Sequence, residues 1–170
     1  MKVLWAPWRM EYILSDQEGH ECIFCPGPDR NKDQERLILY VGSHTMVMMN
    51  RYPYNNCHLL VAPFRHVPSF DELSDQELLA LSRMVRHSIQ SLKRLMNPDG
   101  FNVGVNLGRV AGAGVEAHLH YHIVPRWNGD TSFMTAVGEV RVIPEHIKES
   151  YKKLLPYFEG LKDDSSGGDE

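Results

Sequence analysis

The chain has 170 residues, 42% of them hydrophobic and 24% charged, which suits a single domain able to bury a substantial core. Its formal net charge of −4 argues against binding to duplex nucleic acid, because such surfaces carry a basic stripe. No apolar run approaches the ~18 residues of a membrane helix, and no apolar signal-peptide core follows Met1. We therefore expect a cytoplasmic protein that binds neither membranes nor polymeric nucleic acid.

The N-terminal segment is rich in large apolar side chains, among them Trp5, Trp8 and Tyr12. Such a density near a terminus indicates that the segment packs against the body of the protein or against a partner subunit. A polar stretch rich in turn-forming residues follows at 26–35 and predicts a loop.

Cys22 and Cys25 form a Cys-x-x-Cys pair just before this loop. The spacing suits both a zinc knuckle and a redox pair, but a redox pair usually starts a helix in a βαβ unit, and no such unit is predicted around these cysteines. The third cysteine, Cys57, leaves an odd count, which argues against a disulfide framework. We expect Cys57 to pack as a small hydrophobic residue.

Three short β-rich runs come next. Residues 36–41 and 45–49 flank a short turn and predict a hairpin, and residues 58–62 predict a third strand that ends before a proline. A long helix is predicted after Ser74-Asp-Gln-Glu77, which has the form of a capping box. Apolar residues then recur every three or four positions along one helical stripe: Leu78, Leu81, Val85, Ile89, Leu92 and Met96.

Residues 101–107 alternate as a fourth strand, and a glycine-rich loop follows at 108–114. The fifth strand is predicted around His118-Leu-His120-Tyr-His122 and is ended by Pro125. Side chains two positions apart share one face of a strand, so the three imidazoles would form one row. Alternating histidines are also found as a surface stripe or an adventitious metal-binding tract, so other parts of the chain have to decide between these interpretations.

The C-terminal part is predicted to contain an irregular or extended segment at 131–142, a helix from Pro144 to about Tyr157, and a disordered acidic tail at 161–170. The sum is one α+β domain over residues 1–160. It has about five antiparallel strands in a meander, one long helix packed on the sheet, and a C-terminal helix.

The segment His118-Leu-His120-Tyr-His122-Ile-Val resembles the signature of the histidine triad superfamily of nucleotide hydrolases and transferases, and residues 4–12 resemble the N-terminal lead of bacterial members. The resemblance implies a HIT-like fold, a homodimer, and cleavage of dinucleoside polyphosphates such as diadenosine tetraphosphate. The reaction would pass through a covalent nucleotidyl-histidine, with phosphate or water as the acceptor. The alternatives are a nucleoside phosphoramidate hydrolase and a slow-turnover nucleotide-binding protein that acts as a signal or scaffold.

The resemblance also assigns roles to the three histidines. It makes His120 the nucleophile, with its other ring nitrogen donating to a backbone carbonyl. A neutral imidazole suits that role because its intrinsic pKa is about 6.5. His122 then contacts the phosphates and assists the leaving oxygen, and His118 supports the other two.

Substrate contacts follow from the same resemblance. Asn50 matches a residue that contacts the ribose, and His58 matches a histidine that is either a supporting group behind the site or an ordinary core residue. Asn106 matches an asparagine near the phosphates, and Gly114 ends a loop whose backbone N–H groups can converge on an anion. Two residues depart from the pattern. Cys57 replaces a glycine, and Gly114 replaces a serine or glutamine, which leaves the phosphorylase, hydrolase and phosphoramidase branches open.

Zinc-bearing members of the superfamily take two ligands from a Pro-x-x-His after the third strand and from the first triad histidine. The matching positions here are His66 and His118. With Cys22 and Cys25 they complete four ligands, which leaves no open position and predicts one structural zinc ion per chain. His20 is the next candidate ligand. The alternative is that the cysteines are free thiols and that His66 is an ordinary surface residue.

Overall fold

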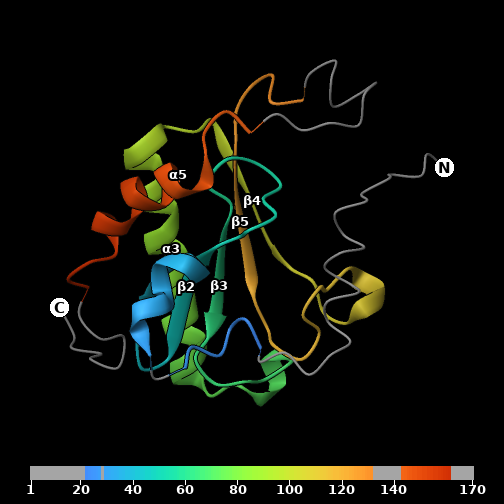
Figure 1. Cartoon of the computed structure of the whole chain (residues 1–170). Helices are drawn as coiled ribbons and strands as arrows, with labels where there is room; N and C mark the ends of the chain where they lie inside the picture. Colours follow the sequence, from blue (N-terminus) through green and yellow to red (C-terminus); the bar gives the residue numbers. More distant parts are fainter. Residues whose placement is uncertain (1–21, 28, 132–142, 162–170) are drawn as a thin grey trace.

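Five antiparallel strands make up one sheet in the order β1-β2-β3-β5-β4 (Figure 1). The computed structural model describes residues 22–27, 29–131 and 143–161. The strands are β1 (Ile38–Val41), β2 (Thr45–Met49), β3 (Leu59–Pro63), β4 (Gly100–Val105) and β5 (Tyr121–Arg126). The helical elements are η1 (Arg30–Lys32), α2 (Asp33–Arg36), η2 (Phe70–Glu72), α3 (Asp75–Met96), η3 (Arg109–Ala111), α5 (Ile147–Leu154) and η4 (Leu155–Tyr157). The predicted α+β fold is confirmed.

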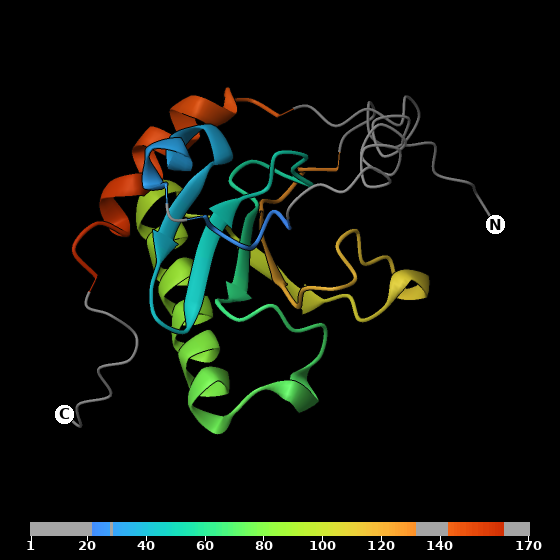
Figure 2. The same ribbon diagram turned by 60° about the horizontal axis from the view of Figure 1, so that its bottom comes forward.

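The long helix α3 begins where the sequence predicts it. The Ser74 hydroxyl accepts from the backbone N–H of Glu77, and the Glu77 carboxylate accepts from the backbone N–H of Ser74, so the capping box is formed. Arg65 donates two hydrogen bonds to the same carboxylate, each at 2.9 Å. Asn97, at a φ of 45°, ends the helix in the left-handed region. Figures 1 and 2 show α3 along one face of the sheet, with α5 beside its C-terminal half.

Both faces of the sheet are covered. Alternate residues of β2 and β3, such as Val47 and Val61, face α3 and α5 and join the main core. The other alternate residues face a second, smaller cluster, which consists of Phe24, Ile38, Met46, Met48, Leu60 and Ala62. Phe24 comes from the segment that carries Cys22 and Cys25. This segment therefore covers the sheet face opposite α3.

The strand that carries the histidines begins later than predicted. β5 starts at Tyr121, so His122 lies in the strand, while His118 and His120 lie in the chain that leads into it. The reason is that the backbone N–H of Leu119 donates to the carbonyl of Val67 at 2.7 Å and leaves the ladder with β3.

Two prolines lie inside strands that were predicted to end before or at them. Pro63 pairs with Thr45 of β2, and Pro125 pairs with Phe101 of β4. The pairing between β3 and β5 extends only over Leu59–Val61 and 121–123. Each proline therefore has a partner strand on one side only, and a missing N–H is tolerated on the other.

The C-terminal helix starts at Ile147, three residues after Pro144. The His146 side chain accepts from the backbone N–H of Lys148 at 3.3 Å and so caps the helix. The predicted N-terminal apolar segment, His20, residues 132–142 and the acidic tail from 162 lie outside the described residues, and the domain boundary at 160 stays a prediction. Within the described part of the chain, no helix is long and apolar enough to cross a membrane.

Candidate active site and metal centre

Three closely spaced histidines present their rings on the sheet face opposite α3. The residues between them belong to the main core. The ring centroids of His120 and His122 are 5.0 Å apart, and Phe24 contacts the rings of both His118 and His120. A cluster of cysteine and histidine side chains that could hold a metal ion borders this histidine row at the His118 end, and His58 borders it at the His122 end.

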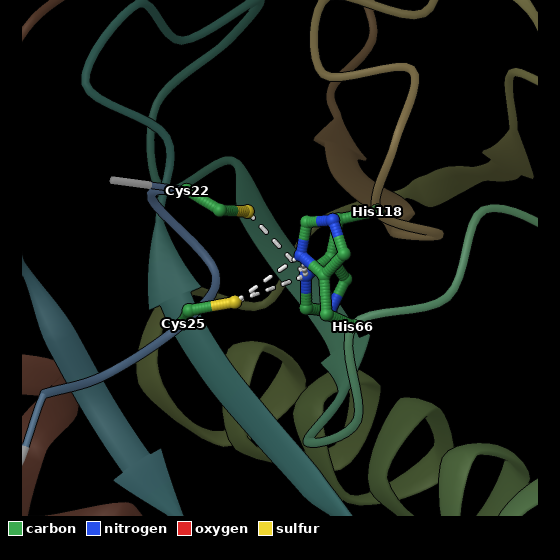
Figure 3. Close-up of side chains that lie close together, drawn as sticks. All are labelled: Cys22, Cys25, His66 and His118. Carbon is green, nitrogen blue, oxygen red and sulfur yellow. Dashed lines mark hydrogen bonds between the residues drawn. The ribbon is translucent and has the colours of Figure 1, made fainter. Parts of the chain in front are cut away.

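His118 faces both cysteine sulfurs, and His66 completes the group (Figure 3). The His118 Nδ1 lies 3.4 Å from the Cys22 Sγ, 3.7 Å from the Cys25 Sγ and 3.2 Å from the His66 Nδ1. The Cys25 Sγ lies 3.3 Å from the His66 Nδ1. Tetrahedral zinc with ordinary bond lengths separates sulfur from nitrogen by about 3.6 Å and two nitrogens by about 3.3 Å. The four residues singled out in the sequence thus lie together at separations that suit zinc.

The protonation states at this cluster also suit a cation. The His118 Nε2 donates to the carbonyl oxygen of Pro63 at 2.9 Å, which leaves a lone pair on Nδ1. Burial lowers the pKa of His118 to about 4, so the ring is neutral at pH 7. Burial raises the pKa of the Cys22 thiol to about 11, so this sulfur needs a cation to be held as a thiolate near neutral pH.

The turn between the two cysteines is fixed through its backbone and through Phe24. The Cys25 N–H donates to the Cys22 carbonyl at 3.0 Å, and the Arg36 Nη2 donates to the carbonyls of Ile23 and Cys25 at 2.9 and 3.2 Å. The Phe24 ring stacks on the His120 ring, with centroids 4.6 Å apart and an interplanar angle of 27°. Sequence reasoning missed Phe24 and Arg36. The one available signal was an apolar residue inside the Cys-x-x-Cys spacing.

His120 carries its ring proton on Nδ1. That nitrogen lies 2.8 Å from the backbone carbonyl of His118, which can only accept. The hydrogen bond expected to fix the tautomer is therefore present, and it leaves the lone pair on Nε2. Burial lowers the pKa of His120, and the bond to the carbonyl offsets this only in part. A neutral imidazole with a lone pair on Nε2 is equipped for nucleophilic attack.

His122 has the opposite arrangement because of His58. The His58 Nδ1 accepts from the backbone N–H of Tyr54 at 3.1 Å, so His58 carries its proton on Nε2. That nitrogen donates to the His122 Nδ1 at 3.0 Å. A neutral His122 therefore carries its own proton on Nε2. His58 is fully buried, and its position directly behind the histidine row favours a supporting role over that of an ordinary core residue.

Asn50 and Tyr54 close this end of the row. The Asn50 Oδ1 accepts from the backbone N–H of Tyr52 at 2.9 Å, which orients the amide so that its Nδ2 lies 3.3 Å from the His58 Nδ1. The Tyr54 ring lies nearly parallel to the His122 ring, at 13° and 5.6 Å between centroids, and 41% of the residue is exposed. Sequence reasoning did not single out Tyr54, although it stands between Asn50 and His58.

Cys57 keeps the turn before His58 in a glycine-like conformation. Its φ is 56°, in the left-handed region, which costs a residue with a side chain about 1 kcal/mol. Its side chain is buried in the main core, as predicted for a small hydrophobic residue, and burial raises the thiol pKa to about 11. Cysteine at position 57 therefore adds backbone strain, but the turn still forms.

The glycine-rich loop projects from the sheet beyond β4 (Figure 2). It turns at Gly108 and Gly112, which have φ values of 79° and 93°. Asn106 donates to the carbonyl of Gly112 at 3.4 Å, and the exposed Arg109 pairs with Glu116 at 3.8 Å. Asn106 directly follows the last residue of β4, and Gly114 ends the loop.

Comparison with known proteins places these features in a wider group. The family profile described as HIT domain matches residues 31–129. AP-4-A phosphorylase of Mycobacterium tuberculosis is 35% identical over 158 residues, which cover 89% of this chain and 81% of that protein. A solved structure, the hypothetical histidine triad nucleotide-binding protein ST2152 of Sulfolobus tokodaii, is 29% identical with a TM-score of 0.59, over 80% of this chain and 88% of its own. A Zn-bound histidine triad family protein of Mycobacterium smegmatis, 24% identical, shares the fold with a TM-score of 0.58 over 71% of this chain and 82% of its own.

Proposed function

The chain belongs to the HIT, or histidine triad, family, and we propose that it cleaves diadenosine tetraphosphate and related dinucleoside polyphosphates through a covalent nucleotide on His120. As a member of this family it is a nucleotide hydrolase or transferase. The observation that carries the proposal is the hydrogen bond from the His120 Nδ1 to the His118 carbonyl, because it leaves the Nε2 lone pair for attack. The substrate is proposed from the likeness to an AP-4-A phosphorylase over 89% of the chain.

The reaction has two displacement steps at one phosphorus. In the first, the His120 Nε2 attacks the α-phosphorus of one adenosine, the bond from that phosphorus to the bridging oxygen breaks, and ATP leaves. The Nε2–H of the neutral His122 would donate a hydrogen bond to the leaving oxygen, which departs as the terminal phosphate anion of ATP. In the second, phosphate or water attacks the same phosphorus, the phosphorus–nitrogen bond breaks, and ADP or AMP is released.

We assign the nucleotide contacts to Asn50, which lies beside His58 at one end of the histidine row, and to Asn106 and the glycine-rich loop, which precede the row in the chain. The Asn50 Oδ1 accepts one backbone N–H and has a second lone pair for a ribose hydroxyl. Asn106 and the backbone of the loop up to Gly114 would bind phosphate oxygens, because glycines let N–H groups converge on an anion. His58 would hold His122 in the tautomer that donates from Nε2.

The cluster of Cys22, Cys25, His66 and His118 is proposed to hold one structural zinc ion per chain. Four protein ligands leave no open coordination position, so the ion would shape the site without contacting substrate. Thiols that stay reduced fit an enzyme of the cytoplasm. Metal analysis of protein purified without added metal tests the assignment: one zinc per chain is expected, and protein that neither carries nor binds zinc would refute it.

A homodimer is the proposed assembly. β4 lies at the edge of the sheet and exposes Val103 at 43%, and an open edge with apolar side chains is a surface on which strands pair. Sedimentation should give twice the chain mass of 19.5 kDa. A single species at the monomer mass would contradict the assembly without touching the chemistry.

Product analysis with diadenosine tetraphosphate tests the activity. ADP plus ATP formed only in the presence of phosphate identifies a phosphorylase, and AMP plus ATP formed regardless of phosphate identifies a hydrolase. Turnover confined to adenosine phosphoramidate, or negligible turnover with tight nucleotide binding, overturns the proposal in favour of a phosphoramidase or a scaffold. Labelled substrate quenched at alkaline pH, where a phosphorus–nitrogen bond survives, should leave one nucleotide on His120.

A further inference from the structure

Phe24 stands between the metal-binding cluster and the nucleophile. It lies inside the Cys-x-x-Cys turn, so its backbone moves with both sulfurs. The residue is 1% exposed, and its ring stacks on the His120 ring at 4.6 Å and contacts the His118 ring at 5.3 Å between centroids. We propose that Phe24 is a positioning residue for His120 and that metal binding at the cysteine turn holds it in place. The inference rests on the proposed role of His120 as the nucleophile.

A stacked ring supplies a constraint that the hydrogen bond of His120 lacks. The bond from the His120 Nδ1 to the His118 carbonyl fixes one ring nitrogen, but the ring can still tilt about the line between those two atoms. Phe24 covers one face of the ring at an interplanar angle of 27°. Misplacing a reacting group by about 1 Å can cost about 100-fold in rate. The Phe24 ring packed against that face therefore controls the direction in which the His120 Nε2 points.

The candidate metal ligands are arranged to hold the Phe24 ring in place. Arg36 fixes the backbone of the turn through two carbonyls, whereas the sulfurs face the imidazoles of His66 and His118. Zinc bound there would tie the turn to His118, whose own carbonyl accepts from His120. Two connections therefore run from the metal ligands to the nucleophile, one through the Phe24 ring and one through the backbone of His118.

The test compares Phe24→Leu with Ile23→Ala as the control. Leucine keeps an apolar side chain in the small cluster but removes the aromatic face, whereas Ile23 lies in the same turn with 38% of its surface exposed. We expect F24L to retain one zinc per chain and an unchanged KM, with kcat lower by about 10- to 100-fold, and I23A to match the parent. Phe24→Met, a second variant without the ring, replaces F24L if the leucine protein folds poorly.

Histidine ring NMR gives a readout that does not depend on turnover. A proton above the face of Phe24 is shielded by the ring current, so the His120 ring-proton resonance should move downfield in F24L. Removing zinc from the parent protein with a chelator should move the same resonance downfield. Adding zinc sulfate should restore the resonance and kcat in the parent, but neither in F24L.

Each result decides one part of the inference. If F24L keeps the parental kcat and the parental His120 resonance, Phe24 is only a core residue and the proposal fails. If the His120 resonance of the parent ignores zinc removal, metal binding does not hold Phe24 in place. If the parent does not cleave diadenosine tetraphosphate, the proposed function fails, whereas the resonance shifts still decide whether Phe24 and the metal orient His120.

Discussion

The two ends of the histidine row differ in what their ring nitrogens face. At one end, His118 donates from Nε2 to the carbonyl of Pro63 and turns the Nδ1 lone pair toward two cysteine sulfurs. At the other end, His122 accepts on Nδ1 from His58 and so carries its proton on Nε2. The first end presents a lone pair, which the proposed metal ion needs, and the second presents an N–H, which the proposed contact with a leaving oxygen needs.

This difference shows how neighbouring residues of one type take different chemical tasks. His120, between the two ends, donates from Nδ1 to the carbonyl of His118 and presents a lone pair on Nε2. In all three cases the task follows from the partner of the second ring nitrogen. For His118 and His120 that partner is a backbone carbonyl. For His122 it is the ring of His58, which a backbone N–H holds in one tautomer. Each assignment can therefore be tested by changing one group.

Replacing the middle histidine should have the largest effect and leave both ends intact. His120→Asn removes the nucleophilic Nε2, while the asparagine amide retains a donor for the His118 carbonyl. Turnover should fall by a factor on the order of 10⁴ or more, with nucleotide binding and zinc content unchanged. Steady-state kinetics, nucleotide titration and metal analysis measure these quantities. Substantial residual turnover would refute the nucleophile assignment.

Removing one of the proposed zinc ligands should mainly lower the folding stability of the protein. Cys22→Ser replaces a thiolate ligand with a hydroxyl that zinc binds poorly, so bound zinc and about 2–4 kcal/mol of folding stability should be lost. Thermal unfolding should show a decrease in Tm of about 2–4 °C for each kcal/mol. Cys57→Ala is the matched control, because it removes a buried thiol from the main core and should keep the zinc. Unchanged metal content in C22S would mean that the ligand set is wrong.

Most of the fold was predictable because its signals are local. The capping box before α3 and the β-rich run of β2 each occupy a few consecutive residues, and both elements lie where predicted. The start of β5 was not predictable, because it depends on the Leu119 N–H bonding the carbonyl of Val67. Such a choice between two distant segments leaves no trace in the local pattern.

The candidate site divides in the same way. The spacing of Cys22 and Cys25 is local, and the resemblance to zinc-bearing relatives supplied the two histidines that the structure places beside them. Phe24 and Tyr54 carry no comparable signal, because an aromatic residue in a turn usually packs in a core or lies on the surface. Only the tertiary structure shows their rings against those of the histidine row.

A pair of substitutions at His58 tests whether this residue sets the tautomer of His122. Asparagine reaches the position of the His58 Nδ1 but has no donor near His122, whereas glutamine places an N–H close to the position of Nε2. We expect His58→Asn to lower kcat by about 10- to 100-fold, with zinc content and KM unchanged, and His58→Gln to recover most of the loss. Equal kcat values for both variants with diadenosine tetraphosphate would mean that the hydrogen bond from His58 does not set the tautomer of His122.

The smallest expected effect is the pH dependence of the middle histidine. The proposed nucleophile would act as a neutral ring, and burial lowers the pKa of His120 below the ordinary value of 6.5. At pH 6.5 more than half of the rings are then neutral, so kcat/KM should change by less than about twofold between pH 8 and 6.5 and fall only in more acidic solution.

Burial also lowers the pKa of His118 to about 4. The folded state therefore binds fewer protons than the unfolded state between about pH 4 and 6.5, and stability declines as the pH falls through that window. The rates must for this reason come from protein shown to be folded and zinc-loaded at each pH. An acid limb centred above pH 6.5 would mean that the surroundings of His120 stabilise its protonated ring, which would contradict the lowered pKa that burial gives this histidine.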